Sequence, residues 1–219
     1  MIELLFRGEV LLFALLVAAL IASLSVHEFG HAYVAKLNGD RTAEYAGRLT
    51  LNPVRHIDPM GLAMVVLVGF GYARPVPTDP RNFRTPRADL WIAAAGPAAN
   101  LLLAALTWNL FLLLRAAGVD LFFSEGPVTF FVLLARVNLL LMLFNLIPLG
   151  PLDGHYILPH LLPARGADAY RHYNARFGSY ALLGLILLSF VGVPVFSRLM
   201  TLAGALLRYL TFVPMVTAP

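Results

Sequence analysis

The sequence predicts an all-α protein that crosses a membrane several times, and three observations support this fold class. Hydrophobic residues make up 59% of the 219 positions and charged residues only 13%, whereas an ordinary soluble domain has about 25% charged residues. Several apolar runs approach the ~20 residues that a transmembrane helix needs. The net charge of +4 comes from basic residues between these runs, which indicates loops facing anionic lipid rather than nucleic-acid binding. We therefore expect one helical bundle of about five or six membrane segments.

The first half of the chain is expected to form one long helix, a polar hairpin and a short apolar segment. The helix is predicted over residues 8–37, where an apolar run reaches the turn sequence NGD without a signal-peptide cleavage site. Segment 41–58 is polar and alternates in short pieces, which is typical of a small β-hairpin. Run 60–70 is too short to span as a straight helix and predicts a re-entrant segment. A loop rich in proline and arginine follows over 71–87.

The second half of the chain contains four more apolar spans and one broken segment. Transmembrane helices are predicted over 88–115 and 127–147, and prolines interrupt the segment at 145–163. Two further spans are predicted over 177–193 and 197–213. We expect all of these elements to belong to a single membrane-embedded domain, because no stretch remains for a second folded unit.

The distribution of lysine and arginine predicts the orientation in the membrane. Basic residues are concentrated in segments 36–87 and 148–176, whereas 116–126 contains none. The positive-inside rule places the first two segments in the cytoplasm, and 116–126 and the N-terminus outside. This arrangement holds only if run 60–70 does not cross the membrane, as its length also indicates.

The clearest chemical signal is the sequence HEFGH at residues 27–31. On a helix, His27 and His31 share one face with Cβ atoms ~5–6 Å apart, so both imidazoles can bind one zinc ion. Glu28 lies next to the first ligand and can take a proton from a water that the metal activates. The alternative is that the histidines only hydrogen-bond to neighbouring helices, but that leaves a costly intramembrane glutamate without a purpose.

A catalytic zinc site needs a third protein ligand and an open position. The chain has no cysteine, so the ligand must be His, Asp, Glu or Asn. Asp153 is the best candidate, because it follows a span broken by Pro148 and Pro151 and should reach a similar depth. An aspartate that only caps a helix at the membrane surface is the alternative.

These motifs resemble those of the site-2 proteases, a family of intramembrane zinc metalloproteases. HEFGH on an early helix and LDG at 152–154 are similar to the metal-binding motifs of the family. Further similar motifs are GRLTLNP at 47–53, HIDP at 56–59, GPAAN at 96–100 and NLIP at 145–148. The resemblance covers about residues 15–160 and is to the short bacterial-type branch without PDZ or CBS domains.

The resemblance implies zinc bound by His27, His31 and Asp153, with Glu28 as the general base. His155 follows LDG where the family usually has a small or polar residue, so an additional ligand or hydrogen bond is expected there. The catalytic core would cover about residues 8–160, followed by additional C-terminal spans at 177–213.

The implied activity is endopeptidase cleavage of single-span membrane proteins within or near their transmembrane helices, as in regulated intramembrane proteolysis. A helical substrate hides its carbonyl groups in i to i−4 hydrogen bonds and must unwind first. A sheet edge at 44–52 would serve to bind the unwound strand. The implied location is a bacterial inner membrane, with the active site toward the cytoplasm.

Three further polar residues are candidates for substrate or oxyanion binding. Asn100 and Asn145 are amides within apolar spans and can stabilise a developing oxyanion, but interhelical hydrogen bonding explains each equally well. His56 is a candidate for the entrance of the site, although histidines in loops are commonly just solvated. Arg136, in the middle of a span, has no predicted catalytic role and is expected to snorkel or to pair within the bundle.

A membrane protein that binds or transports metal ions is the main alternative function. Such a carrier has no need for a base between its ligands, and it would more often show paired repeats with broken helices. No such repeat is present in the sequence. A non-catalytic relative would usually have lost Glu28 or a ligand. The sequence predicts neither the physiological substrate nor the oligomeric state.

Overall fold

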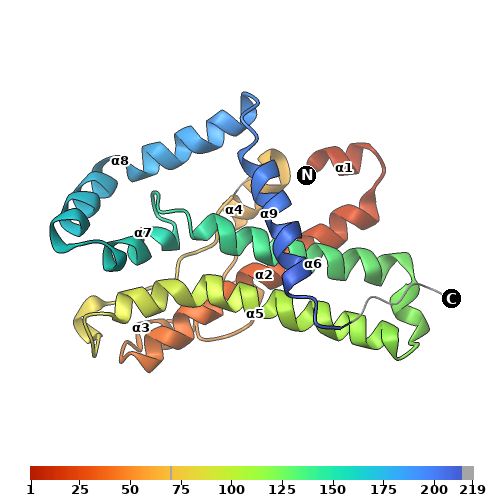
Figure 1. Cartoon of the computed structure of the whole chain (residues 1–219), viewed down its shortest axis with the longest axis horizontal. Coiled ribbons are helices and arrows are strands. Elements are labelled where there is room, and N and C mark those ends of the chain that lie inside the picture. The colour runs from red at the N-terminus through yellow and green to blue at the C-terminus, as the bar shows by residue number, and fades with distance from the viewer. Residues whose placement is uncertain (70, 214–219) are drawn as a thin grey trace.

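The computed structural model describes residues 1–69 and 71–213, and within them all regular secondary structure is helical. Three long helices lie side by side along the long axis of the molecule, α2 (Val10–Leu37), α5 (Ala88–Ala116) and α6 (Glu125–Asn145) (Figure 1). The other elements are α1 (Ile2–Phe6), α3 (Thr42–Tyr45), η1 (Pro53–Arg55), α4 (Pro59–Val68), η2 (Pro80–Asn82), η3 (Asp120–Phe123), α7 (Asp153–Ile157), η4 (Leu158–Leu161), α8 (Ala164–Phe190) and α9 (Val195–Tyr209).

Helices α2, α5 and α6 are each long and apolar enough to cross a membrane. Helices α8 and α9 pass the same test only as a pair, and the pair is bent by 90°. Gly192, with φ of 96°, and Pro194 lie in this break, where a left-handed glycine and a proline stop a helix. By length and composition, the described residues therefore provide three candidate spans, or four if the bent pair is one span, and the predicted count of five or six membrane segments is not confirmed.

The predicted β-hairpin at 41–58 is wrong, and with it the sheet edge at 44–52. The Asp40 carboxylate accepts a hydrogen bond from the Thr42 backbone N–H (3.0 Å) just before α3 begins. Asn52 accepts one from the Val54 N–H (3.1 Å) and caps η1, whose first residue is Pro53. Aspartate, asparagine and proline at these positions favour turns and helix starts over strand pairing, and this local chemistry outweighs the alternation.

The short apolar segment forms α4, which doubles back instead of continuing. Asp58 caps the helix by accepting from the Met60 and Gly61 N–H groups at 3.0 Å each, and Gly69 ends it with φ of 85°. A Cβ on Gly61 would lie 2.0 Å from the Tyr72 carbonyl oxygen, so the returning chain passes the first turn of α4. This supports the prediction that the segment does not cross the bilayer; its last residue, Phe70, lies outside the described residues.

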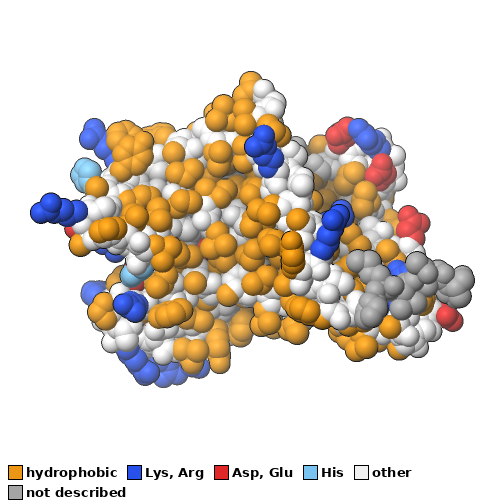
Figure 2. All heavy atoms as spheres, viewed as in Figure 1, with side chains coloured by type: hydrophobic (Ala, Val, Ile, Leu, Met, Phe, Trp, Pro, Cys, Tyr) orange, Lys and Arg blue, Asp and Glu red, His pale blue; other side chains and the backbone are white. Residues whose placement is uncertain are grey.

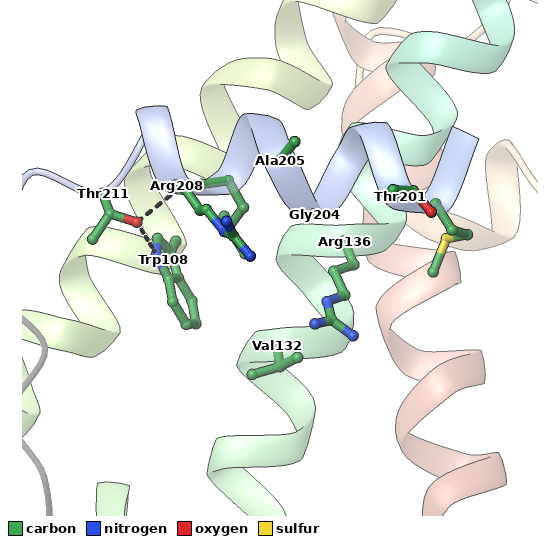
Figure 3. A pocket seen from close by; sticks show the side chains of 10 residues that line it. Trp108, Val132, Arg136, Thr201, Gly204, Ala205, Arg208 and Thr211 are labelled. Carbon is green, nitrogen blue, oxygen red and sulfur yellow. Dashed lines mark hydrogen bonds between the residues drawn. The ribbon is translucent and has the colours of Figure 1, made fainter. Parts of the chain in front are cut away.

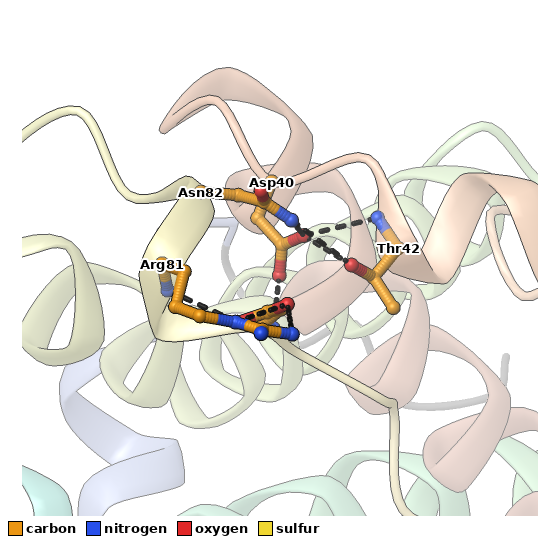
Figure 4. A network of polar contacts seen from close by, with 5 residues as sticks. Asp40, Thr42, Arg81 and Asn82 are labelled. Atoms are coloured by element: carbon orange, nitrogen blue, oxygen red, sulfur yellow. Dashed lines mark hydrogen bonds and ion pairs between the residues drawn. The ribbon is translucent and has the colours of Figure 1, made fainter.

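A buried polar cluster joins the end of α2 to the loop before α5 (Figure 4). The Asp40 side chain is fully buried and accepts from Thr42, from the Asp79 backbone N–H (2.8 Å) and from the Asn82 amide (3.1 Å). Burial raises the pKa of Asp40, but these hydrogen bonds, first that from Thr42, outweigh it and hold the pKa below its ordinary value of 3.8. The cluster fixes the end of the bundle where most basic residues gather (Figure 2).

The core outside the metal centre lies where α9 crosses α5 and α6. Buried side chains from all three helices form it, including Trp108, Phe111, Leu139, Ala203 and Leu207. Because lipid tails are as apolar as these side chains, close packing rather than the hydrophobic effect holds such helices together in a bilayer. The same helices α5 and α6 position the polar residues described next.

Candidate metal centre

Helix α2 presents His27, Glu28 and His31 to the interior of the bundle, and all three are buried. The histidines are one helical turn apart, as predicted from their spacing. Their Nε2 atoms lie 3.1 Å from each other. These two nitrogen atoms therefore converge on one point between the helices.

Asp153 is the first residue of α7 and reaches the same point from the other half of the chain. Its Oδ2 lies 3.2 Å from His27 Nε2, and its Oδ1 lies 3.3 Å from His31 Nε2. His27, His31 and Asp153 form a group whose ligand atoms all lie within 4.8 Å of one another. The structure thus brings together the three residues that the sequence predicted as metal ligands.

Two hydrogen bonds fix the orientation of the imidazole rings. His27 Nδ1 donates to the Asn100 side-chain oxygen at 2.6 Å, and His31 Nδ1 donates to the Ile92 carbonyl at 2.7 Å. Both acceptors are oxygens, so the Nδ1 atoms carry the hydrogen and the Nε2 lone pairs are free for a metal. Partners of this kind orient histidine ligands and raise their basicity.

Asn100 is itself held by its neighbours on both sides. Its amide donates to the Ser23 carbonyl of α2 (3.1 Å) and to the Asn138 side-chain oxygen of α6 (2.7 Å). The Asn138 amide donates to Leu134 within its own helix (2.8 Å). A continuous chain of buried amides therefore connects α6 through α5 to the ring of His27, which is the interhelical role that the sequence analysis left open.

Glycines make the close approach of α2 and α5 possible. A Cβ on Gly96 would lie 2.4 Å from His31 Nε2 and 2.6 Å from His27 Cε1. A Cβ on Gly30 would lie 2.8 Å from the Ala95 carbonyl oxygen. Since real Cβ contacts are never this short, both positions must be glycine for the histidines to face α5 at this distance.

The residues present fit a zinc ion. Zinc bonds of about 2.0–2.1 Å in tetrahedral geometry place ligand atoms ~3.3 Å apart, close to the 3.1–3.3 Å observed. Asp153 Oδ2 is buried and accepts no hydrogen bond within the described residues. Two imidazole lone pairs and a carboxylate facing one another need a cation between them. Two histidines and one carboxylate are also a donor set of catalytic zinc sites.

Glu28 lies beside this group but does not belong to it. The residue as a whole is buried, and its carboxylate makes no hydrogen bond within the described part of the chain. The negative charge of Glu28 acts on the buried Arg48. Burial holds the pKa of the Arg48 guanidinium below its ordinary value, and the charge of Glu28 only partly offsets this effect. Arg48 in turn donates to the carbonyl groups of Arg74 (2.6 Å) and Pro75 (3.0 Å), so the loop after α4 is held near Glu28.

Helix α8 supports the turn that leads to Asp153, a role that was not predicted from the sequence. The Asn174 side chain accepts from the Gly150 N–H (3.1 Å) and donates to the Gly150 carbonyl (3.2 Å) and to His155 Nδ1 (2.7 Å). Tyr170 donates to the Pro148 carbonyl at 3.0 Å. A row of residues four apart faces this turn: Tyr170, Asn174, Gly178, Leu182 and Ile186. This spacing of four residues is the sequence signal from which the contact of α8 with the turn could have been predicted.

The remaining predicted residues make hydrogen bonds to partners outside the metal group. Asn145 donates to Leu141 in its own helix (3.0 Å). His56 is fully buried and hydrogen-bonds to the Thr50 carbonyl (2.7 Å), stabilising the loop after α3. His155 has the extra hydrogen bond that was expected, and its partner is Asn174. Roles of Asn145 and His56 in substrate binding stay predictions.

The chain matches the model of a known protein family. Residues 15–122 and 120–189 match the family described as Peptidase family M50. These ranges include His27, His31 and Asp153 and extend over the row of α8 residues that contacts the turn. No solved structure matches the chain significantly.

Curated bacterial proteins are similar to most of the chain. YwhC of Bacillus subtilis, described as a "Putative zinc metalloprotease", is 47% identical over 151 residues, which cover 68% of this chain and 69% of YwhC. Rip2 of Mycolicibacterium smegmatis and Rip3 of Mycobacterium tuberculosis have the same description. Rip2 is 36% identical over 69% of this chain and 59% of its own length, and Rip3 is 35% identical over 77% of this chain and 37% of its own length.

Proposed function

The chain belongs to peptidase family M50, and we propose on that basis that it is a zinc metalloprotease that cleaves membrane proteins within or near their transmembrane helices. The observation that supports this most directly is the convergence of His27, His31 and Asp153, with their ligand atoms within 4.8 Å of one another, next to the buried Glu28. The names of the similar bacterial proteins agree with zinc as the metal.

We propose that His27 Nε2, His31 Nε2 and one oxygen of Asp153 hold the zinc ion. When bound, the ion supplies Lewis-acid activation of a water molecule and of the scissile carbonyl. Asn100 and the Ile92 carbonyl keep the two imidazole rings in the required orientation. The turn held by Asn174 keeps the Asp153 carboxylate in place.

The proposed role of Glu28 is that of general base and then general acid. Its carboxylate takes a proton from the attacking water while the water oxygen bonds to the peptide carbonyl carbon. The same carboxyl group then gives this proton to the leaving nitrogen as the C–N bond breaks. Because Glu28 makes no hydrogen bond to the described residues, its oxygens are free for both transfers.

The proposed substrates are membrane-spanning segments, because the site lies deep along α2. His27 and His31 precede the last helical residue, Leu37, by ten and six residues, which places them about 9–15 Å inside that end of the helix. A substrate must unwind to expose its carbonyl groups there. With no strand at 44–52, an unwound substrate would be bound by side chains and loop backbone instead of by a preformed sheet edge.

We further propose that the end of α2 and the start of α5 face the cytoplasm of a bacterium. These two helix ends lie at the same end of the molecule, and the turn between α5 and α6 lies at the other (Figure 1). The connecting segment between α2 and α5 has seven of the 16 lysine and arginine residues, and residues 116–126 have none. The positive-inside rule then places the N-terminus outside and the metal centre nearer the cytoplasm.

The proposed function is tested with purified protein and a panel of single-span polypeptides that contain helix-breaking residues. The samples are wild type, Glu28→Gln and the matched control Glu125→Gln, which alters a carboxylate at the start of α6. Zinc content is measured in all three. We expect fragments from wild type and from the control, and a rate lower by about 10²–10⁴-fold for Glu28→Gln with zinc retained.

Two results would contradict the proposal. Cleavage by Glu28→Gln at the wild-type rate would remove Glu28 from the mechanism. Zinc-loaded wild type that cuts no member of the panel, yet moves zinc across the membrane of sealed liposomes, would favour metal transport.

A further inference from the structure

A second polar site lies outside the metal centre, in a cavity of about 620 Å³ between α5, α6 and α9. Trp108 of α5 and Val132 and Arg136 of α6 line one side, and Arg208 of α9 lines another. Figure 3 shows the two arginine side chains extending from facing helices toward the same space. Trp108 donates to the Thr211 hydroxyl (2.9 Å), which fixes the indole ring at the edge of the cavity.

The cavity is positively charged without compensation from the described residues. Neither Arg136 nor Arg208 forms an ion pair with an acidic side chain there. Helix α9 has no Asp or Glu, and the acidic residues of α5 and α6, Asp89 and Glu125, are near the first turns of their helices. Two guanidinium groups that face one cavity therefore have no acidic counterion among residues 1–69 and 71–213.

Arg136 also lies in the middle of an apolar helix. It precedes Asn138 by two residues, about 3 Å along the helix axis, and Asn138 belongs to the amide chain that reaches His27. Arg136 is exposed whereas Asn138 is fully buried, so the arginine is at the depth of the metal centre but on another face. Charged groups at such positions are costly and need an anionic partner.

We propose that this cavity binds the phosphate of an anionic phospholipid headgroup. Guanidinium groups bind phosphate oxygens through paired hydrogen bonds, and a phosphate is the anion that a bilayer supplies. Trp108 is eight residues, about 12 Å, from the end of α5, so long arginine side chains can reach toward the headgroups on that side. The apolar lining, including Val132 and Leu207, suits an acyl chain.

In the experiment that tests this proposal, the fluorescence of Trp108 reports lipid binding in the cavity. The chain has two tryptophans, Trp91 and Trp108, so Trp91→Phe leaves one indole at the cavity. This protein is reconstituted with phosphatidylglycerol or phosphatidylcholine brominated on the acyl chains, and quenching of Trp108 emission is titrated. Arg136→Gln, Arg208→Gln and the double variant are compared with Arg198→Gln, which removes an exposed arginine of α9 that does not line the cavity.

We expect stronger quenching by the anionic lipid in the starting protein and in Arg198→Gln. Each cavity substitution should reduce the preference about fivefold, and the double variant should treat both lipids alike. Equal quenching by both lipids in the starting protein would overturn the proposal, as would an unchanged preference in the double variant with unaltered helix content. Displacement of the lipid by inorganic phosphate alone would assign the site to a free anion and also overturn it.

Discussion

The ring of His27 is held by a side-chain amide, whereas the ring of His31 is held by a backbone carbonyl. Only the first can be removed by substitution. We expect Asn100→Ala to weaken zinc binding by about 10–100-fold, because His27 then loses the acceptor that fixes its tautomer. Competition with a chelator measures the affinity. Asn145→Ala is the matched control, since Asn145 bonds only within its own helix; equal loss in both variants would contradict this role of Asn100.

Gly96 also affects the candidate metal centre directly, because it lies against the His27 and His31 rings. A Cβ there would lie 2.4 Å from His31 Nε2, so Gly96→Ala must displace a ligand. We expect the purified variant to have little zinc while remaining helical. Gly184→Ala in α8 serves as the control, because a Cβ at that position meets nothing within 4 Å. Normal zinc content in Gly96→Ala, measured by elemental analysis, would show that the helices can separate without cost.

At the scale of single residues, the convergence of the candidate ligands was predictable from the sequence, and the residues that support them were not. His27, Glu28 and His31 follow from helical spacing, and Asp153 follows from the need of a third ligand. The supports depend on which helices meet. Asn100 could be recognised as a polar residue in an apolar span, but only the contact between α2 and α5 shows that it bonds to His27.

Helix α8 contacts the turn before Asp153 through a row of residues four apart. Asn174→Ala removes both hydrogen bonds to Gly150 and leaves its buried N–H unsatisfied, at a cost of about 1–3 kcal/mol. We expect weaker zinc binding and a lower Tm, because Asp153 follows this turn by three residues. Ser179→Ala, an exposed change on the same helix, is the control. A lower Tm with unchanged zinc affinity would mean that α8 stabilises the fold without positioning the ligand.

At the scale of elements, the long apolar helices were predicted to within a few residues and the polar segments were not. Hydropathy predicts the bounds of α2, α5 and α6 because each of these helices is apolar along most of its length. It gave no sign that the polar first half of α8 is helical, since that half is stabilised by contacts with the turn at 148–155. Gly192 and Pro194 mark the break before α9, but the direction that α9 takes after it depends on packing against α5 and α6, which the local sequence does not encode.

The two ends of the molecule differ in their content of basic residues. Because the chain has no cysteine, a cysteine introduced at either end would be the only thiol that a labelling reagent can modify. Single cysteines introduced at exposed alanines can be tested with a membrane-impermeant maleimide in intact cells. We expect Ala117→Cys to be labelled, and Ala46→Cys and Ala164→Cys to react only after the membrane is opened. Labelling of Ala46→Cys but not Ala117→Cys in intact cells would reverse the proposed orientation.

The metal centre takes its ligands from α2 and α7, and α8 completes the support. During translation the ribosome releases these elements in that order. A growing chain therefore has Glu28 and the two histidines in the membrane well before the carboxylate that completes the candidate site, and α8, which holds the turn before this carboxylate, follows later. The proposed hydrolytic site is therefore complete only after α8 has been synthesised, so a chain that has not yet reached α8 would not cleave itself or the insertion machinery beside it.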